Sequence, residues 1–88
     1  MFKRGNIVRS IKGRDKDKIS VVLSFSDNKV YISDGKEHKL TEPKLKNPKH
    51  LEKLNINIDE SFLIGNERLR KQLNRLKKWY RLVEIHFK

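Results

Sequence analysis

The clearest pattern in the chain is the alternation of hydrophobic and polar positions over residues 19–25. Every second position there is hydrophobic: Ile19, Val21, Leu23 and Phe25. A period of two is that of a β-strand, so the pattern predicts a strand that turns these side chains toward a core. Asp27 and Asn28 follow at once, and both tolerate the positive φ that a two-residue hairpin turn requires. We therefore predict a hairpin that returns along residues 29–33.

Other segments are expected to extend this hairpin into a small sheet. Residues 6–11 are rich in β-branched side chains and are predicted to pair with the first strand across the polar loop 12–18. The turn signal Asp34-Gly35 precedes residues 37–40, which we predict as a further short strand. Two prolines bracket residues 44–47. Because proline lacks the backbone donor that a central strand needs, this stretch is predicted to be loop or edge.

The rest of the chain is predicted to be a packed connector and an amphipathic helix. The connector contains hydrophobic residues that need cover: Ile56, Ile58, Phe62, Leu63 and Ile64. Asn66 is a suitable N-cap for the helix. Spacings of three and four then define one hydrophobic seam: Leu69, Leu73, Leu76, Tyr80, Val83 and Phe87. Val83, Ile85 and Phe87 also alternate, which leaves a terminal strand open as the other interpretation.

Chain length limits the architecture, because 88 residues support one small hydrophobic core. We predict a mainly β fold with three sections. Residues 1–54 form a small barrel whose core Leu51 and Leu54 close, 55–65 form the packed connector, and 66–88 form the basic helix with its open end. Barrel closure removes exposed sheet edges, which suits a chain with only 35% hydrophobic residues.

The charge balance indicates the kind of partner. The chain has 22 Lys and Arg against 11 Asp and Glu, a net charge of +11. Such an excess predicts a polyanionic partner, either a nucleic acid or an anionic membrane surface. Residues 65–88 alone contain 8 cationic and 2 acidic residues, so the predicted helix is the most densely charged section.

Several classes of protein are excluded or made improbable by what the chain contains. It has no cysteine, which excludes disulfide staples and cysteine-ligated zinc. No hydrophobic run reaches ten residues, so we expect neither a membrane span nor a signal peptide. We therefore expect a cytoplasmic location. His38, His50 and His86 show no metal-ligand spacing, and no nucleophile or phosphate-loop motif is visible. We expect no catalysis, no metal, no cofactor and no small-molecule substrate.

Segments around the first hairpin also carry a family pattern. They are Gly5-Asn6-Ile7-Val8-Arg9-Ser10, Lys12-Gly13-Arg14-Asp15-Lys16 and Val21-Val22-Leu23. Together they resemble the KOW motif of ribosomal proteins and transcription elongation factors. The continuation is similar to the KOW proteins of the archaeal and eukaryotic large ribosomal subunit and to their small bacterial relatives. It comprises Val30-Tyr31-Ile32-Ser33-Asp34-Gly35, Lys39-Leu40 and Pro48-Lys49-His50-Leu51.

This resemblance covers roughly residues 5–54 and implies an SH3-like barrel that binds RNA and has no catalytic activity. We further expect the protein to associate with the ribosome. The family usually has a second glycine where this chain has Asp17. Aspartate is one of the few residues that tolerate a left-handed backbone, so the loop can keep its shape if that conformation is required there.

Cations on two loops and on the helix are the candidate RNA contacts, because arginine pairs bidentately with phosphate and lysine acts as a mobile point charge. The set is Arg9, Lys12, Gly13, Arg14, Lys16, Lys18, Lys39, Lys44, Lys46, Lys49, His50, Arg68, Lys71, Arg75 and Lys78. Each group could instead be a solvated surface. Tyr31 could stack on an unpaired base or be an ordinary half-buried strand residue.

The helix has two further interpretations. It could lie on an anionic membrane with Trp79 and Tyr80 at the interface, or self-associate weakly through its leucine seam. We predict instead a non-catalytic, ribosome-associated protein that docks on structured ribosomal RNA through basic loops and a basic helix, with no membrane partner. A protein-interaction module of the translation or transcription machinery and a DNA-binding accessory protein are the alternatives.

Overall fold

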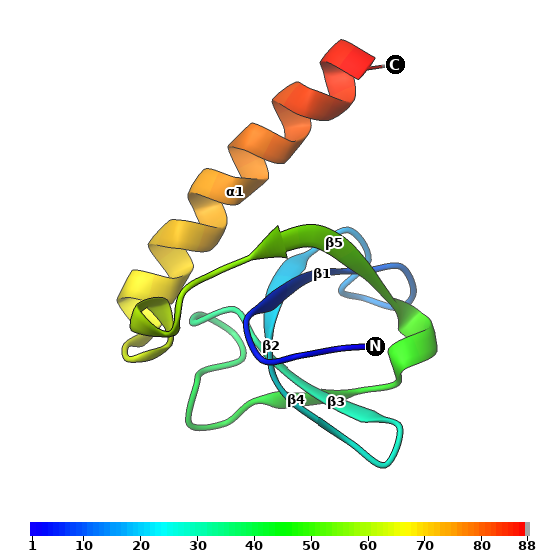
Figure 1. Ribbon diagram of the computed structural model, residues 1–88, viewed down its shortest axis with the longest axis vertical. Coiled ribbons are helices and arrows are strands. Elements are labelled where there is room, and N and C mark those ends of the chain that lie inside the picture. The colour runs from blue at the N-terminus through cyan, green and yellow to red at the C-terminus, as the bar shows by residue number, and fades with distance from the viewer. Residues whose placement is uncertain (88) are drawn as a thin grey trace.

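The computed structural model describes the backbone of residues 1–87 and the side chains of residues 1–80. Its elements are β1 (Asn6–Ser10), β2 (Ile19–Ser26), β3 (Lys29–Ser33), β4 (Lys44–Lys46), η1 (Pro48–His50), β5 (Leu51–Asn57), η2 (Glu60–Leu63) and α1 (Asn66–Phe87). The η elements are short 3-10 helices. The five strands form one antiparallel sheet in the order β4-β3-β2-β1-β5. The fold is therefore mainly β with a C-terminal helix (Figure 1).

Both predicted hairpins are present. β1 pairs with β2 so that Val8 lies opposite Ser20, and the hairpin of β2 and β3 turns at Asp27 and Asn28. These two residues have φ values of 51° and 61°. Positive φ at both central residues matches the twist of a two-residue hairpin, which confirms the predicted turn.

The predicted strand over residues 37–40 is wrong, because the side chain before it folds the backbone into turns. Asp34 Oδ1 accepts from the backbone N–H groups of Lys36 and His38, both at 2.9 Å. Such side-chain acceptors compete with a strand ladder for the same donors. The next strand is instead β4, which pairs with β3 at the sheet edge, in the stretch between the two prolines. β5 then continues to Asn57, past the predicted end of the barrel section at residue 54.

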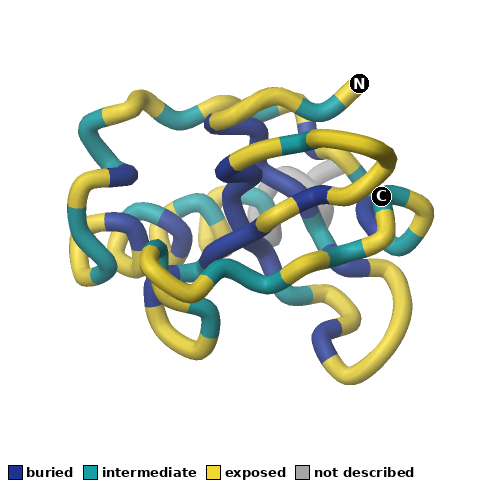
Figure 2. The backbone as a smooth tube through the Cα atoms, turned by 90° about the horizontal axis from the view of Figure 1, so that it is seen from below, coloured by how far each residue is buried: buried dark blue, intermediate teal, exposed yellow. Residues whose placement is uncertain are grey.

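The sheet buries hydrophobic side chains on both faces. The cluster beneath α1 and η2 contains Ile7, Ile19, Val21, Leu23, Leu54, Leu63, Leu69 and Leu73. The cluster on the opposite face contains Val8, Val22, Val30, Ile32 and Leu51. Neighbouring strand residues point to opposite faces, so the central strands β1 and β2 contribute to both clusters. Most buried segments accordingly lie toward the middle of the molecule, with exposed loops around them (Figure 2).

Phe25 lies on the other face from the one that the alternation predicted. The register between β2 and β3 shifts between Val22 and Ser24. A bulge of this kind reverses the facing of the residues that follow it. Phe25 therefore packs against the cluster that contains Val22, and its ring centroid lies 5.8 Å from that of Phe2.

The helix docks through its predicted seam. Leu69 and Leu73 are buried, and Leu76 and Tyr80 pack against the cluster beneath the helix. The described backbone remains helical through Phe87, where the alternation left a strand open. The side chains of the later seam positions lie outside the described residues. Figure 1 shows the last turns of α1 extending beyond the sheet.

The connector packs as predicted except at one position. Leu63 is buried, and Ile56 and Ile58 pack against the same cluster as the helix. Ile64 was expected to be covered but is 75% exposed, because the chain turns there from η2 into α1. Asn66 begins the helix, and its Oδ1 accepts from the backbone N–H of Leu40 at 2.7 Å. Its side chain thus ties the helix to the loop 34–43 rather than capping it.

Gly35 allows this loop to touch the first turn of α1. Its φ is +74°, and a Cβ placed on it would lie 2.3 Å from the carbonyl oxygen of Asn66. Both features exclude a side chain, because the left-handed conformation is strained for other residues and the nearest atom belongs to the helix backbone.

We expect Gly35→Ala to lower the free energy of unfolding by more than the roughly 1–2 kcal/mol that a left-handed backbone costs by itself. Gly13→Ala is the matched control, because Gly13 has a φ of +85° with no heavy atom within 4 Å of a built Cβ. Urea denaturation followed by circular dichroism measures both variants. Equal losses of unfolding free energy in the two variants would show that the helix backbone near Gly35 adds no steric cost.

Candidate nucleic-acid interface

The loop between β1 and β2 is ordered by its own backbone. Lys16 N–H donates to the carbonyl of Gly13 at 3.2 Å, and Asp17 N–H donates to the carbonyl of Ser10 at 2.7 Å. Gly13 and Asp17 have φ values of 85° and 72°, so the left-handed conformation considered for Asp17 is confirmed. The turns leave the side chain of Arg14, among others, exposed to solvent.

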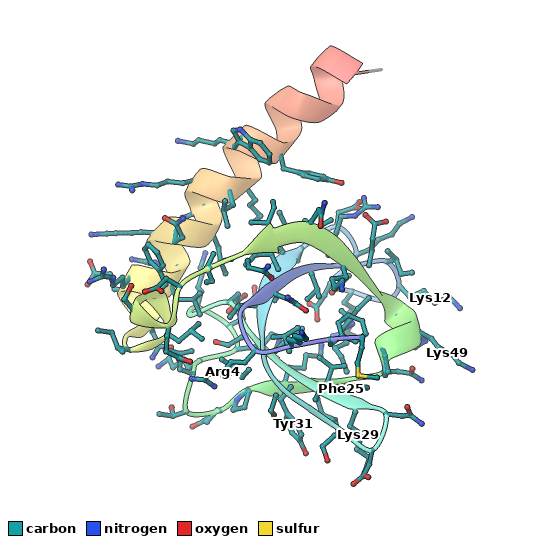
Figure 3. The ribbon with its side chains drawn as sticks, in the orientation of Figure 1. Arg4, Lys12, Phe25, Lys29, Tyr31 and Lys49 are labelled. Atoms are coloured by element: carbon teal, nitrogen blue, oxygen red, sulfur yellow. The ribbon has the colours of Figure 1, made fainter. Side chains whose placement is uncertain are left out.

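This loop lies against the segment that joins β4 to β5. Ile11 N–H donates to the carbonyl of His50 at 2.9 Å, and Lys12 and Lys49 point outward on the same side of the molecule (Figure 3). The side chain of Asn47 accepts from the backbone of Lys49 at 2.9 Å and so fixes the start of η1. Two predicted groups of cations, far apart in sequence, therefore adjoin in space.

We call this surface the loop patch, and it consists of Lys12, Arg14, Lys16, Lys46 and Lys49. All but the half-buried Lys46 are exposed. Among the described side chains, no carboxylate lies within ion-pair distance of any of the five. Their charges therefore remain available to an external anion.

Arg9, a predicted contact, is engaged inside the protein. Its Nη1 lies 3.2 Å from Asp17 Oδ1, and its Nη2 lies 3.0 Å from Glu52 Oε2. The hydrogen bond to Glu52 is the main cause that raises the pKa of Arg9. Its side chain is 27% exposed and joins β1, the loop and β5, which is a structural role.

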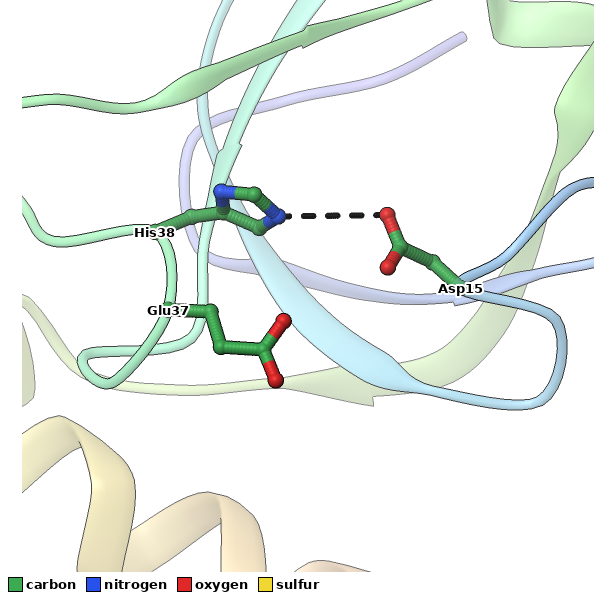
Figure 4. A group of neighbouring side chains, drawn as sticks. All are labelled: Asp15, Glu37 and His38. Carbon is green, nitrogen blue, oxygen red and sulfur yellow. Dashed lines mark ion pairs between the residues drawn. The ribbon is translucent and has the colours of Figure 1, made fainter.

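Lys18 and Lys44 are also predicted contacts, and both belong to a cluster around Asp15. Asp15 Oδ2 lies 2.5 Å from Lys44 Nζ and 3.8 Å from His38 Nε2, and Asp15 Oδ1 lies 3.8 Å from Lys18 Nζ. Lys18 also lies 3.1 Å from Glu37. We call these five residues the Asp15 cluster; Figure 4 shows its two carboxylates and its imidazole. The hydrogen bond from Lys44 is the main cause that lowers the pKa of Asp15.

The Asp15 cluster has the composition of a metal site but a different charge balance. The ligand atoms of Asp15, Glu37 and His38 lie within 4.8 Å of one another, a proximity that the spacing of the histidines did not indicate. Two lysine ammonium groups already neutralise the two carboxylates. The arrangement therefore joins the loop, β4 and residues 34–43 electrostatically, and it offers no excess negative charge to a cation.

The helix carries a second basic surface, which we call the helix stripe: Arg68, Lys71, Arg75 and Lys78. Spacings of three and four place these exposed residues on one helix face. The Arg68 guanidinium lies over the Phe62 ring at 5.2 Å from its centroid, which holds its planar group in place. Lys71 lies 3.1 Å from Glu67, an exposed pair of the kind that contributes little to stability.

The two basic surfaces lie on different sides of the molecule. Figure 1 shows α1 on one side of the sheet and η1 on the other. Between the helix and the sheet loops is a cleft of ≈220 Å³ lined in part by Lys18, Lys36, Arg70, Lys77, Asp34 and Glu37. Lys36 thus faces the helix while Lys49 belongs to the loop patch, so the loop cations of residues 36–50 do not form one surface. Lys39 is exposed in the loop 34–43, and His50 is half-buried.

Comparisons with known proteins add no family assignment. No protein-family model matches the sequence, and no curated protein shows significant similarity to it. In the part of the chain that the structure describes, no helix has the length and apolar character needed to cross a membrane.

The Asp15 cluster makes stability depend on pH. Because the pKa of Asp15 is lower in the folded protein, the unfolded chain binds the proton more readily. The stability from Asp15 is thus complete above its unfolded pKa, ~4, and is lost as the pH falls through the folded pKa.

We expect Asp15→Asn to lower the free energy of unfolding at neutral pH by about 1–3 kcal/mol and to flatten its decline below pH ~4. Glu60→Gln is the control, because it removes only the exposed ion pair with Arg4 and should have a smaller effect on both. Urea denaturation at a series of pH values measures this. The same pH profile in Asp15→Asn as in the unmodified protein would contradict the role given to the cluster.

Proposed function

We propose that this protein is a non-catalytic, cytoplasmic RNA-binding protein that docks on structured RNA, ribosomal RNA in particular. The observation that carries the proposal is the loop patch: five cations from two chain segments that adjoin in space with no carboxylate at ion-pair distance among the described side chains. Phosphate groups are the anions that a surface of this kind neutralises, and phosphate contacts supply most of the affinity for a nucleic acid.

Pre-organisation favours binding by this surface. The turns of the β1–β2 loop, the Ile11–His50 hydrogen bond and the Asn47 side chain fix the backbone that carries the cations. The Lys44–Asp15 ion pair also joins this loop to the edge strand β4. Binding then orders few additional degrees of freedom, which preserves more of the interaction energy.

The KOW resemblance favours RNA over other polyanions. It covers roughly residues 5–54, which include both chain segments that carry the loop patch. We further propose that the sheet is an SH3-like barrel of the KOW type. The antiparallel strand order and the positive φ values at Gly13 and Asp17 are consistent with that assignment.

A structured RNA fits the charge distribution better than a single straight duplex. The loop patch and the helix stripe lie on different sides of the molecule, so one ligand that contacts both must fold around the protein or present two backbone segments. Folded ribosomal RNA offers such surfaces. Contacts of this kind position the protein and carry little sequence information.

We expect replacement of Lys12, Arg14 and Lys16 by alanine to weaken binding to a fluorescein-labelled RNA hairpin about tenfold or more. It should also reduce the slope of log K against log salt by ~2–3, because each lost phosphate contact contributes ~0.7–0.9. Fluorescence anisotropy at several salt concentrations measures both.

The control for this variant is the triple replacement of Lys3, Lys36 and Lys77 by alanine. It removes the same charge from places outside the two basic surfaces and should have a much smaller effect. Equal weakening by both triple variants would show that net charge alone drives binding. A matched DNA hairpin bound as tightly as RNA would favour the DNA-binding alternative, and no RNA binding at all would overturn the proposal.

Association with ribosomes tests the proposed partner in cells. We expect the tagged protein to co-sediment with ribosomes from lysate and to be released by mild RNase treatment. Retention on ribosomal protein after RNase would instead identify a protein-interaction module. The triple variant of the loop patch should show reduced co-sedimentation, because it lacks the proposed phosphate contacts.

A further inference from the structure

The only tryptophan of the chain lies exposed beside the helix stripe. Trp79 is 53% exposed, although tryptophan is highly buried on average. It follows Arg68 and Arg75 at intervals of eleven and four residues, which places it on nearly the same line along the helix. The stripe of cations therefore ends at an indole ring that is largely open to solvent.

The helix holds this ring at a defined place. Leu76 and Tyr80 pack against the cluster beneath α1, so the turn that carries Trp79 is anchored to the sheet. Trp79 is nevertheless 53% exposed, so about half of its surface stays open to solvent beside these contacts. Its ring therefore lies at the border between the packed seam and the helix stripe.

We propose that Trp79 stacks on an unpaired base of the bound RNA while the helix stripe contacts the adjacent phosphates. This inference rests on the proposed function and specifies its ligand as an RNA in which an unpaired nucleotide adjoins a duplex. Bases inside an A-form duplex are already stacked and lie out of reach of side chains, whereas an unpaired base offers a free face. Aromatic rings beside a positively charged track are the general means of holding such nucleotides.

Tyr31, the other exposed aromatic residue considered for stacking, fits this role less well. It is 36% exposed and lies opposite Leu45 in the pairing of β3 with β4. Directly opposite residues on one sheet face are close neighbours, so Leu45 lies beside Tyr31. Tyr31 also lies on the sheet, away from the helix stripe.

An anionic membrane is the other class of ligand that a basic helix with an exposed tryptophan could bind. In that case Trp79 and Tyr80 would both reach the lipid interface. Among the described side chains of α1, Tyr80 instead packs against the protein core, which leaves Trp79 as the one aromatic ring for the interface. The charge of the stripe and the single exposed ring fit an RNA better.

Intrinsic tryptophan fluorescence, excited selectively over tyrosine, tests the proposal directly, because Trp79 is the one tryptophan of the chain. Two unlabelled RNA hairpins serve as probes: one fully paired in its stem, and one with the same stem and a single bulged nucleotide. We expect the bulged RNA to quench the emission and the paired stem to change it little. The affinities are measured separately by anisotropy with labelled copies of the same hairpins.

The binding affinities of protein variants give the second measurement. Trp79→Ala should weaken binding of the bulged hairpin about 5- to 150-fold, the usual range for loss of one base–aromatic stack, and change binding of the paired hairpin less than about twofold. Trp79→Phe should retain most of the affinity for the bulged RNA. Ile64→Ala, which truncates a hydrophobic side chain that is 75% exposed, should behave as the unmodified protein does.

The outcomes separate this inference from the proposed function. If both hairpins bind but the emission is unchanged and Trp79→Ala does not discriminate between them, stacking is overturned and RNA binding stands. If neither hairpin binds, the proposed function itself fails. A blue shift of the emission on phosphatidylserine vesicles, with no response to RNA, would replace the RNA by a membrane. Circular dichroism of Trp79→Ala shows whether the variant is folded, and the quenching measurement needs no variant.

Discussion

The ion pair between Asp15 and Lys44 is the interaction on which the proposed interface depends. It joins a loop with no hydrophobic side chain from residue 12 to residue 18 to the edge strand β4, across 29 positions of sequence. A polar loop of this kind has little hydrophobic surface with which to hold itself against the sheet. The buried carboxylate supplies that attachment, and Lys18 and His38 surround it with further positive or protonatable groups. The position of the loop patch follows from this contact.

The cations of the chain fall into two groups with different roles. Arg9, Lys18 and Lys44 are paired with carboxylates and stabilise the arrangement of loops and strands. The cations of the loop patch and of the helix stripe project from that framework into solvent. A basic loop without the acidic residues would repel itself and lose its shape. Acidic residues at Asp15 and Asp17 therefore help to organise a positive surface rather than diminish it.

Sequence patterns predicted the local structure well where one period dominated, as in the hairpin at Asp27 and Asn28 and in the helix seam. They failed where a single side chain redirected the backbone: Asp34 turned a predicted strand into turns, and the bulge after Val22 moved Phe25 to the other face. They also listed the candidate cations without separating paired from unpaired ones. That distinction depends on long-range contacts such as Arg9–Glu52, which no spacing along the chain encodes.

The two basic surfaces act as parts of one rigid unit because the helix is fastened to the sheet at its first turn. The Asn66 side chain accepts a hydrogen bond from the backbone N–H of Leu40, and Gly35 lies so close to the helix that a Cβ there would meet its backbone. Leu69 and Leu73 bury the same part of the helix in the core. A ligand that contacts both surfaces must therefore present its phosphates at a fixed separation and angle. In the proposed complex, selectivity for a particular RNA fold would come from that geometry without hydrogen bonds to bases.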